Sequence, residues 1–204
     1  MKRPPSTHRR VDRKRREERR TIKVFAEGAV TEYEYLRHCE RRSSEATFHW
    51  GEYGMAPMTL VDRAREDVRR SRRSARRHGS PDFDEIWCVF DMDNHPDIPK
   101  ALFEARQSNI HVALSNPCFE LWLVLHCEDQ NAFIERKTVQ RRASDLGLIK
   151  GKRIPTEALE LLEENYEEAK RRAKHLIALH EGNGTKPQSN PSTDIWRLVD
   201  RIRP

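Results

Sequence analysis

Two acidic motifs each follow an apolar segment that has the length of a β-strand. Glu27 comes directly after residues 21–26, and Asp91 and Asp93 come directly after residues 86–90. Residues two apart in an extended chain project to the same side, so the carboxylates of Asp91 and Asp93 point together. Converging carboxylates repel one another unless a cation lies between them, and a hard divalent ion with oxygen ligands suits that position. We therefore expect Glu27, Asp91 and Asp93 to bind Mg²⁺ or Mn²⁺.

Several acids near these motifs are candidates for catalysis. A bound divalent ion would polarise a phosphate ester and generate hydroxide. Glu27 alternatively acts as a general acid or base, which requires a raised pKa. Glu120 and Glu32 each lie near the start of an expected helix and are further candidates, although acids in a first helical turn also complement the helix dipole. His95 is a weaker candidate, and a simple turn is the alternative interpretation of Asp91 and Asp93.

Strand and helix patterns alternate along the chain up to residue 128. Residues 85–90 are almost continuously apolar, which is typical of a strand buried on both faces. This alternation implies right-handed crossovers and a parallel sheet whose strand carboxyl ends share one edge. Open α/β sheets bind their ligands at that edge. The expected strands are 21–26, 47–53, 85–90 and 110–114, and the expected helices are 31–42, 59–78, 99–109 and 117–126.

Two helix starts carry capping signals. Thr31 is followed three residues later by an acid, the pattern of a capping box. Asn116 precedes Pro117 in the way that an N-cap precedes the first helical position. We expect the last helix to begin at residues 190–193. In this arrangement the first amides of the helix after Thr31 lie beside Glu27, where they could receive a phosphate.

The composition divides the chain into three parts. Residues 1–20 lack apolar periodicity and are expected to form a disordered basic arm. Residues 2–20 hold ten Lys and Arg against three acids, a balance of +7 in a chain of net charge +6, so the remainder is close to neutral. Residues 21–128 form the expected α/β domain. Residues 129–204 form a helical extension packed on the same domain, with helices expected at 131–146 and 155–181.

Basic residues indicate a polyanionic partner. The arm favours such a partner electrostatically, although a solubilising tail is the alternative. The expected helix 59–78 is dense in arginine, and a backbone-contacting nucleic-acid surface and an ordinary solvated face both remain open for it. The arginines considered as nucleic-acid contacts are Arg63, Arg69, Arg70, Arg73, Arg76 and Arg77.

Other classes of protein are disfavoured. The chain has no apolar run of membrane-spanning length and starts with arginines rather than with a signal peptide, so we expect it in the cytoplasm. The four cysteines show no metal-ligand spacing. No Walker A or dinucleotide-binding fingerprint is present, which argues against unaided ATP hydrolysis by that route.

Longer stretches resemble a known family. The acidic motifs are similar to those of TOPRIM domains, in which a Glu acts in acid–base chemistry or metal binding and a DxD motif binds Mg²⁺. Around them, four stretches look like the RloB family, and the stretch Ser-Asn-Pro-x-Phe-Glu-Leu-Trp is the most specific. They cover residues 27–32, 89–93, 115–123 and 190–193.

The resemblance implies a TOPRIM-like, Rossmann-like parallel sheet flanked by helices, with a helical C-terminal extension. It also implies a Mg²⁺-dependent nuclease, possibly acting on tRNA, that serves in bacterial anti-phage defence by abortive infection. An ATPase encoded alongside is the implied protein partner. The alternative is a non-catalytic regulator that binds nucleic acid or that ATPase without cutting.

Overall fold

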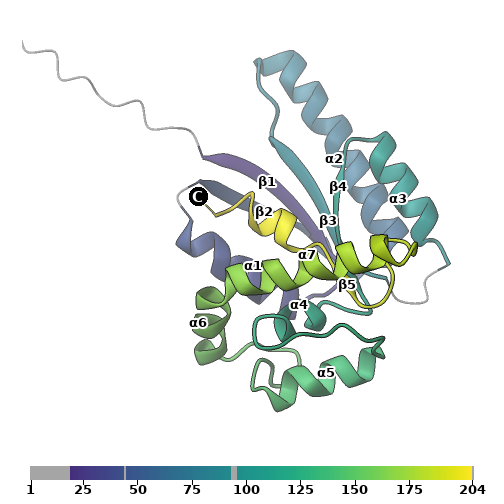
Figure 1. The fold of residues 1–204 in the computed structure, drawn as a ribbon. Helices are drawn as coiled ribbons and strands as arrows, with labels where there is room; N and C mark the ends of the chain where they lie inside the picture. The colour runs from purple at the N-terminus through teal and green to yellow at the C-terminus, as the bar shows by residue number, and fades with distance from the viewer. Residues whose placement is uncertain (1–18, 44, 93–95, 204) are drawn as a thin grey trace, which may run out of the picture.

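Five strands form one sheet at the centre of the molecule (Figure 1). The structure is a computed structural model that describes residues 19–43, 45–92 and 96–203. The strand order is β2-β1-β3-β4-β5; the first four strands are parallel, and β5 runs antiparallel to β4. The strands are β1 (Arg20–Ala26), β2 (Ala46–Tyr53), β3 (Glu85–Asp91), β4 (His111–Asn116) and β5 (Ser192–Thr193). The expected α/β fold class is confirmed.

Helices cover both faces of this sheet (Figure 1). Helices α2 and α3 pack on one face, whereas α1 and the helices after β4 contribute to the core on the other. The helices are α1 (Thr31–Arg42), α2 (Pro57–His78), α3 (Ile98–Gln107), α4 (Glu120–Val124), α5 (Arg136–Asp145), α6 (Thr156–Glu164), α7 (Tyr166–Gly182) and α8 (Trp196–Val199). Among the described helices, none is long and apolar enough to cross a membrane.

The central strand β3 is apolar on both sides because each side meets a different core. Trp87 and Val89 belong to the core beneath α1 and α4, while Cys88 and Phe90 belong to the core beneath α2 and α3. Its neighbours β1 and β4 leave it no edge open to water. The sequence prediction for this strand is confirmed, and burial on two faces is its physical reason.

Two capping predictions are wrong. Thr31 is the first residue of α1 rather than its cap, and its hydroxyl donates to the carbonyl oxygen of Lys152 at 2.7 Å. Asn116 is the last residue of β4, and its side-chain amide donates to the carbonyl oxygen of Gln188 at 2.7 Å. In both cases a distant segment of chain offers a better partner than the local backbone. A capping pattern in the local sequence cannot predict such a distant partner.

The prediction that a helix begins at residues 190–193 is also wrong. Ser192 and Thr193 form β5, which pairs with Asn116 and Ser115 at the end of β4. The hydroxyls of Ser115 and Thr193 are 2.8 Å apart and buried. The single helix predicted at 155–181 is two helices, α6 and α7, separated at Asn165.

The C-terminal part of the chain shares its core with the sheet. Leu162, Tyr166 and Leu198 lie in the same buried cluster as Trp122 of α4 and Val24 of β1. The division at residue 128 stays a prediction, because a shared core neither requires nor excludes it. The basic arm lies almost wholly outside the described residues.

His126 is buried in this core as a neutral imidazole. Its Nδ1–H donates to the carbonyl oxygen of Trp122 at 2.8 Å, and its Nε2 lies 3.4 Å from the hydroxyl of Tyr35. Burial lowers the pKa of His126 from 6.5 to about 4. The unfolded chain therefore binds a proton at this residue between pH 6.5 and pH 4, whereas the folded chain does not.

We predict that this histidine makes folding stability fall as the pH falls. Between pH 7 and pH 5 the unfolding free energy of the unsubstituted chain should drop by about 2 kcal/mol more than that of His126→Gln, which cannot titrate. Urea unfolding at both pH values measures the difference. Parallel pH profiles for the two proteins would contradict the prediction.

Candidate metal-binding and catalytic site

Glu27 and Asp91 lie side by side at the carboxyl edge of the sheet. Their strands are adjacent and parallel, with Ala26 opposite Val89. The backbone N–H of Glu27 donates to the carbonyl oxygen of Val89 at 2.9 Å. The backbone N–H of Asp91 donates to Oε2 of Glu27 at 3.2 Å. The first acidic motif thus contacts the second directly, while Asp93 and His95 lie outside the described residues.

Glu32 brings a third carboxylate to this edge. It lies in the first turn of α1, and its carboxylate packs directly over Gly28. A Cβ atom at residue 28 would lie 1.8 Å from Oε2 of Glu32, so any other residue there would displace that carboxylate from its present position. The Glu32 carboxylate thus lies beside the first turn of α1, and the binding of an external anion by the amides of that turn stays a prediction.

Burial and mutual repulsion raise the pKa values of two of these acids. The pKa of Glu32 rises to about 7, because the side chain is buried and because Glu120 and Glu27 lie nearby. The pKa of Asp91 is raised well above its usual range, first by burial and then by the charge of Glu32. A carboxyl group with a pKa near 7 can both hold and release a proton at neutral pH, as general acid–base catalysis requires.

Arg136 supplies the positive charge beside these acids. One of its guanidinium nitrogens lies 3.0 Å from Oδ2 of Asp91. The Asp91 side chain is only 7% exposed, whereas 39% of the Arg136 side chain is exposed. Arg136 also lowers the pKa of Glu32, against the effect of burial. The Arg136 side chain is thus partly exposed to solvent, while its guanidinium contacts the nearly buried carboxylate of Asp91.

Helix α5 presents a second side chain to the same cluster. Gln140 lies four residues after Arg136, so the two share one face of the helix. The amide of Gln140 donates to Oε1 of Glu120 at 3.4 Å. Glu120 itself is 9% exposed and begins α4. The candidate site is therefore closed by a helix from the C-terminal part of the chain.

Asn190 holds the segment that leads into α5. Its side-chain oxygen accepts the backbone N–H of Ile134 at 3.0 Å, and its amide donates to the carbonyl oxygen of Ile134 at 2.9 Å. Ile134 lies two residues before Arg136. Asn190, which we had expected at the start of the last helix, thus positions the segment that leads into the helix carrying Arg136.

The donor set suits a hard divalent cation, but the described residues alone do not complete a metal site. Carboxylate oxygens are the ligands that Mg²⁺ prefers. Among residues 19–43, 45–92 and 96–203, no three His, Cys, Asp or Glu side chains form a group that could hold a metal ion. Asp93 is not among them. A cation bound at Asp91 competes with Arg136 for the same carboxylate.

Sequence reasoning missed Arg136 and Gln140. They lie in a predicted helix, 131–146, that holds several other Arg residues, and nothing in its pattern separates Arg136 from Arg141 or Arg142. Arg136 is the first residue of α5, where a cation opposes the helix dipole. If the start of α5 had been predicted correctly, this unfavourable placement would have been the one local signal that distinguishes Arg136 from the other arginines.

The arginines of α2 lie elsewhere. Helix α2 begins after β2, near the acidic edge, and ends before β3, at the opposite edge of the sheet. Arg63 contacts Glu52 and Glu66, and Arg70 contacts Asp67. Within the described part of the chain, the remaining candidates are exposed and have no carboxylate partner; these are Arg69, Arg73, Arg76 and Arg77. Their contact with nucleic acid stays a prediction.

Comparison with known proteins identifies a family. The family model described as RloB-like protein matches residues 22–202. This range includes every described residue of the acidic cluster, together with α5 and Asn190. No curated protein and no solved structure matches the chain.

We predict that Arg136→Gln destabilises the protein by about 2 kcal/mol, because it leaves the buried Asp91 without its cation. The expected loss is smaller than for a fully buried pair, since 39% of the Arg136 side chain is exposed. Arg142→Gln is the matched control, because Arg142 lies on the same helix and pairs with Glu128 at the surface. Urea unfolding measures both variants, and equal stabilities would refute the assigned role of Arg136.

Proposed function

The chain belongs to the RloB-like family, and we propose that it is a Mg²⁺- or Mn²⁺-dependent nuclease of TOPRIM type that hydrolyses phosphodiester bonds in RNA or DNA. The observation that carries the proposal is the contact between two acidic motifs on adjacent parallel strands, where Oε2 of Glu27 accepts the backbone N–H of Asp91. The resemblance of both motifs to TOPRIM sequences supports it further.

Each acid has a proposed role. Asp91 and Asp93 would hold the metal ion, and Glu27 would complete its ligands or carry a proton. A metal ion bound there would polarise the phosphorus centre and lower the pKa of a bound water. Glu120 would act as a second acid–base group, oriented by its hydrogen bond from Gln140. Glu32 joins these candidates because its pKa of about 7 lets it hold or release a proton at neutral pH.

Arg136 has a place in this proposal as a charge-neutralising group. It would keep the carboxylates together before the metal ion binds, and it would then be available to a phosphate oxygen of the substrate. The exposed part of its side chain supports access from solution.

The proposed biological role is that of an effector in bacterial anti-phage defence, acting by abortive infection with an ATPase as partner. This role rests on the family resemblance. Its test is plating of phage on cells that express the chain together with that ATPase. The unsubstituted protein should reduce plaque numbers, and Asp91→Asn should restore them.

A second candidate function is a non-catalytic regulator that binds nucleic acid or the ATPase. One observation favours it: Arg136 already satisfies Asp91, as a permanent structural ion pair would. In that case the acidic cluster would stabilise the fold and never hold a metal ion.

Cleavage assays separate the two functions. We predict that the purified chain cuts at least one labelled substrate among tRNA, single-stranded RNA, single-stranded DNA and duplex DNA when Mg²⁺ or Mn²⁺ is present, and none in chelator. Asp91→Asn should reduce the rate by at least about 100-fold, because it removes a charged metal ligand. Arg142→Gln should leave the rate unchanged.

Mn²⁺ binding measured by calorimetry gives a readout that needs no activity. The nuclease proposal expects binding that Asp91→Asn abolishes. Absence of Mn²⁺ binding together with absence of cleavage of all four substrates would sink the proposal and favour the regulator.

A further inference from the structure

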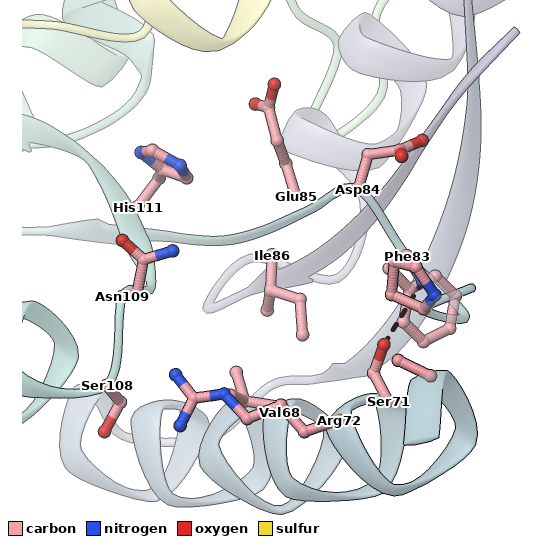
Figure 2. A pocket seen from close by; sticks show the side chains of 12 residues that line it. Val68, Ser71, Arg72, Phe83, Asp84, Glu85, Ile86, Ser108, Asn109 and His111 are labelled. Carbon is pink, nitrogen blue, oxygen red and sulfur yellow. Dashed lines mark hydrogen bonds between the residues drawn. The ribbon is translucent and has the colours of Figure 1, made fainter. Parts of the chain in front are cut away.

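Two hollows lie at the amino-terminal edge of the sheet, opposite the acidic cluster. The first, of about 220 Å³, is bounded by α2 and by the starts of β3 and β4 (Figure 2). The second, of about 360 Å³, is bounded by the end of α3, the start of β4 and α8. Asn109 and His111 line both hollows. The two hollows are therefore neighbours at the surface, with Asn109 and His111 between them.

Basic side chains from four different elements line these two hollows. Arg72 of α2 lines the first hollow, Arg106 of α3 and Arg197 of α8 line the second, and His111 of β4 lines both. Arg72 and Arg106 are exposed, and neither has a carboxylate partner within the described part of the chain. Arg197 makes a loose contact of 3.7 Å with Asp194, and its guanidinium lies over the ring of Trp196 at 5.5 Å from the centroid. His111 stacks on Trp87 with ring centroids 4.8 Å apart, which holds its imidazole in place.

The two acids that line the first hollow are already engaged. Glu85 pairs with the guanidinium of Arg201 and accepts the indole N–H of Trp87 at 2.8 Å. Asp84 accepts the backbone N–H of Thr21 at 2.7 Å. Figure 2 shows the guanidinium of Arg72 reaching toward Ser108, while both carboxylates point away from it. Arg72 and Ser108 thus lie on a side of the hollow to which neither carboxylate points, whereas His111 is close enough to Glu85 to interact with it electrostatically.

These cations are spread over two hollows rather than gathered around one point. A single small anion needs convergent donors, whereas successive phosphates of a polymer need separated ones. The arginines of α2 extend the row, since Arg69, Arg72 and Arg76 are three and four residues apart and share one helix face. The spacing therefore fits a polyanion that runs along the surface.

We propose that this edge is a second binding surface for the phosphate backbone of nucleic acid, formed by Arg72, Arg106, His111 and Arg197. The proposal deepens the proposed function and rests on it for the identity of the polymer. Glu85 and Asp91 lie at opposite ends of β3, six residues or about 20 Å apart. That span corresponds to roughly six nucleotides, so the surface would anchor the substrate remote from the bond that is cut.

The test measures binding separately from cleavage. Full-length protein carrying Asp91→Asn is titrated, in chelator, against a labelled 20-nucleotide RNA and a labelled 20-base-pair DNA duplex at several salt concentrations. The two substitutions Arg72→Gln and Arg106→Gln are then introduced together into the Asp91→Asn protein. The matched control is the pair Arg142→Gln and Arg171→Gln, which removes the same charge from arginines that pair with Glu128 and Glu168 elsewhere on the surface.

We predict that the Arg72 and Arg106 pair weakens binding roughly ten-fold near 0.1 M salt and lowers the slope of log affinity against log salt by about two, one for each lost phosphate contact. The control pair should change neither quantity appreciably. Equal affinities and slopes for the two pairs, or no binding of either probe by the Asp91→Asn protein, would overturn the proposal. Displacement of both probes by polyglutamate of equal charge at equal concentration would also overturn it, in favour of an acidic protein partner.

The result of this binding test does not depend on whether the chain cleaves nucleic acid. If the surface binds as predicted but the unsubstituted chain cuts nothing, the nuclease proposal fails and the binding surface stands. If the chain cuts its substrates but the two pairs bind alike, the surface fails and the nuclease proposal stands.

Discussion

The carboxylate of Asp91 is almost wholly removed from water, and other carboxylates lie close by. A buried charge of this kind is costly unless a partner neutralises it or a proton does. The fold meets that constraint with Arg136, which comes from a helix 45 residues further along the chain. The C-terminal part of the chain, which shares its apolar core with the sheet, thus also delivers one guanidinium to one buried carboxylate.

Delivery of Arg136 depends on contacts that lie outside the acidic cluster. The side chain of Asn190 fixes the backbone of Ile134 just before α5, and β5 ties the same stretch to the end of β4. Strand β4 in turn pairs with β3, whose last residue is Asp91. The positions of Arg136 and Asp91 are therefore both fixed by contacts with the same sheet, and this keeps the distance between them well defined.

The acidic cluster and the exposed arginines lie at opposite ends of the strands of the sheet. Its carboxyl edge gathers acids suited to a metal ion, and its amino-terminal edge exposes Arg72 and Arg106, which have no acid partners in the described part of the chain. Keeping the two apart prevents the arginines from neutralising the acids directly. A polymer can reach both edges at once, whereas a small substrate can reach only one.

The sequence by itself determined the α/β sheet and its parallel core, because strand periodicity and burial are local properties of the chain. It predicted Glu27 and Asp91 at one edge of that sheet, whereas the pairing of β1 with β3, which brings them into contact, was decided by the tertiary structure. Only the tertiary structure decided that Thr31 and Asn116 bond to distant carbonyls, that Ser192 and Thr193 form a strand, and that Arg136 lies against Asp91. Each of these contacts depends on a partner that is far away in sequence, so a local sequence pattern cannot predict it.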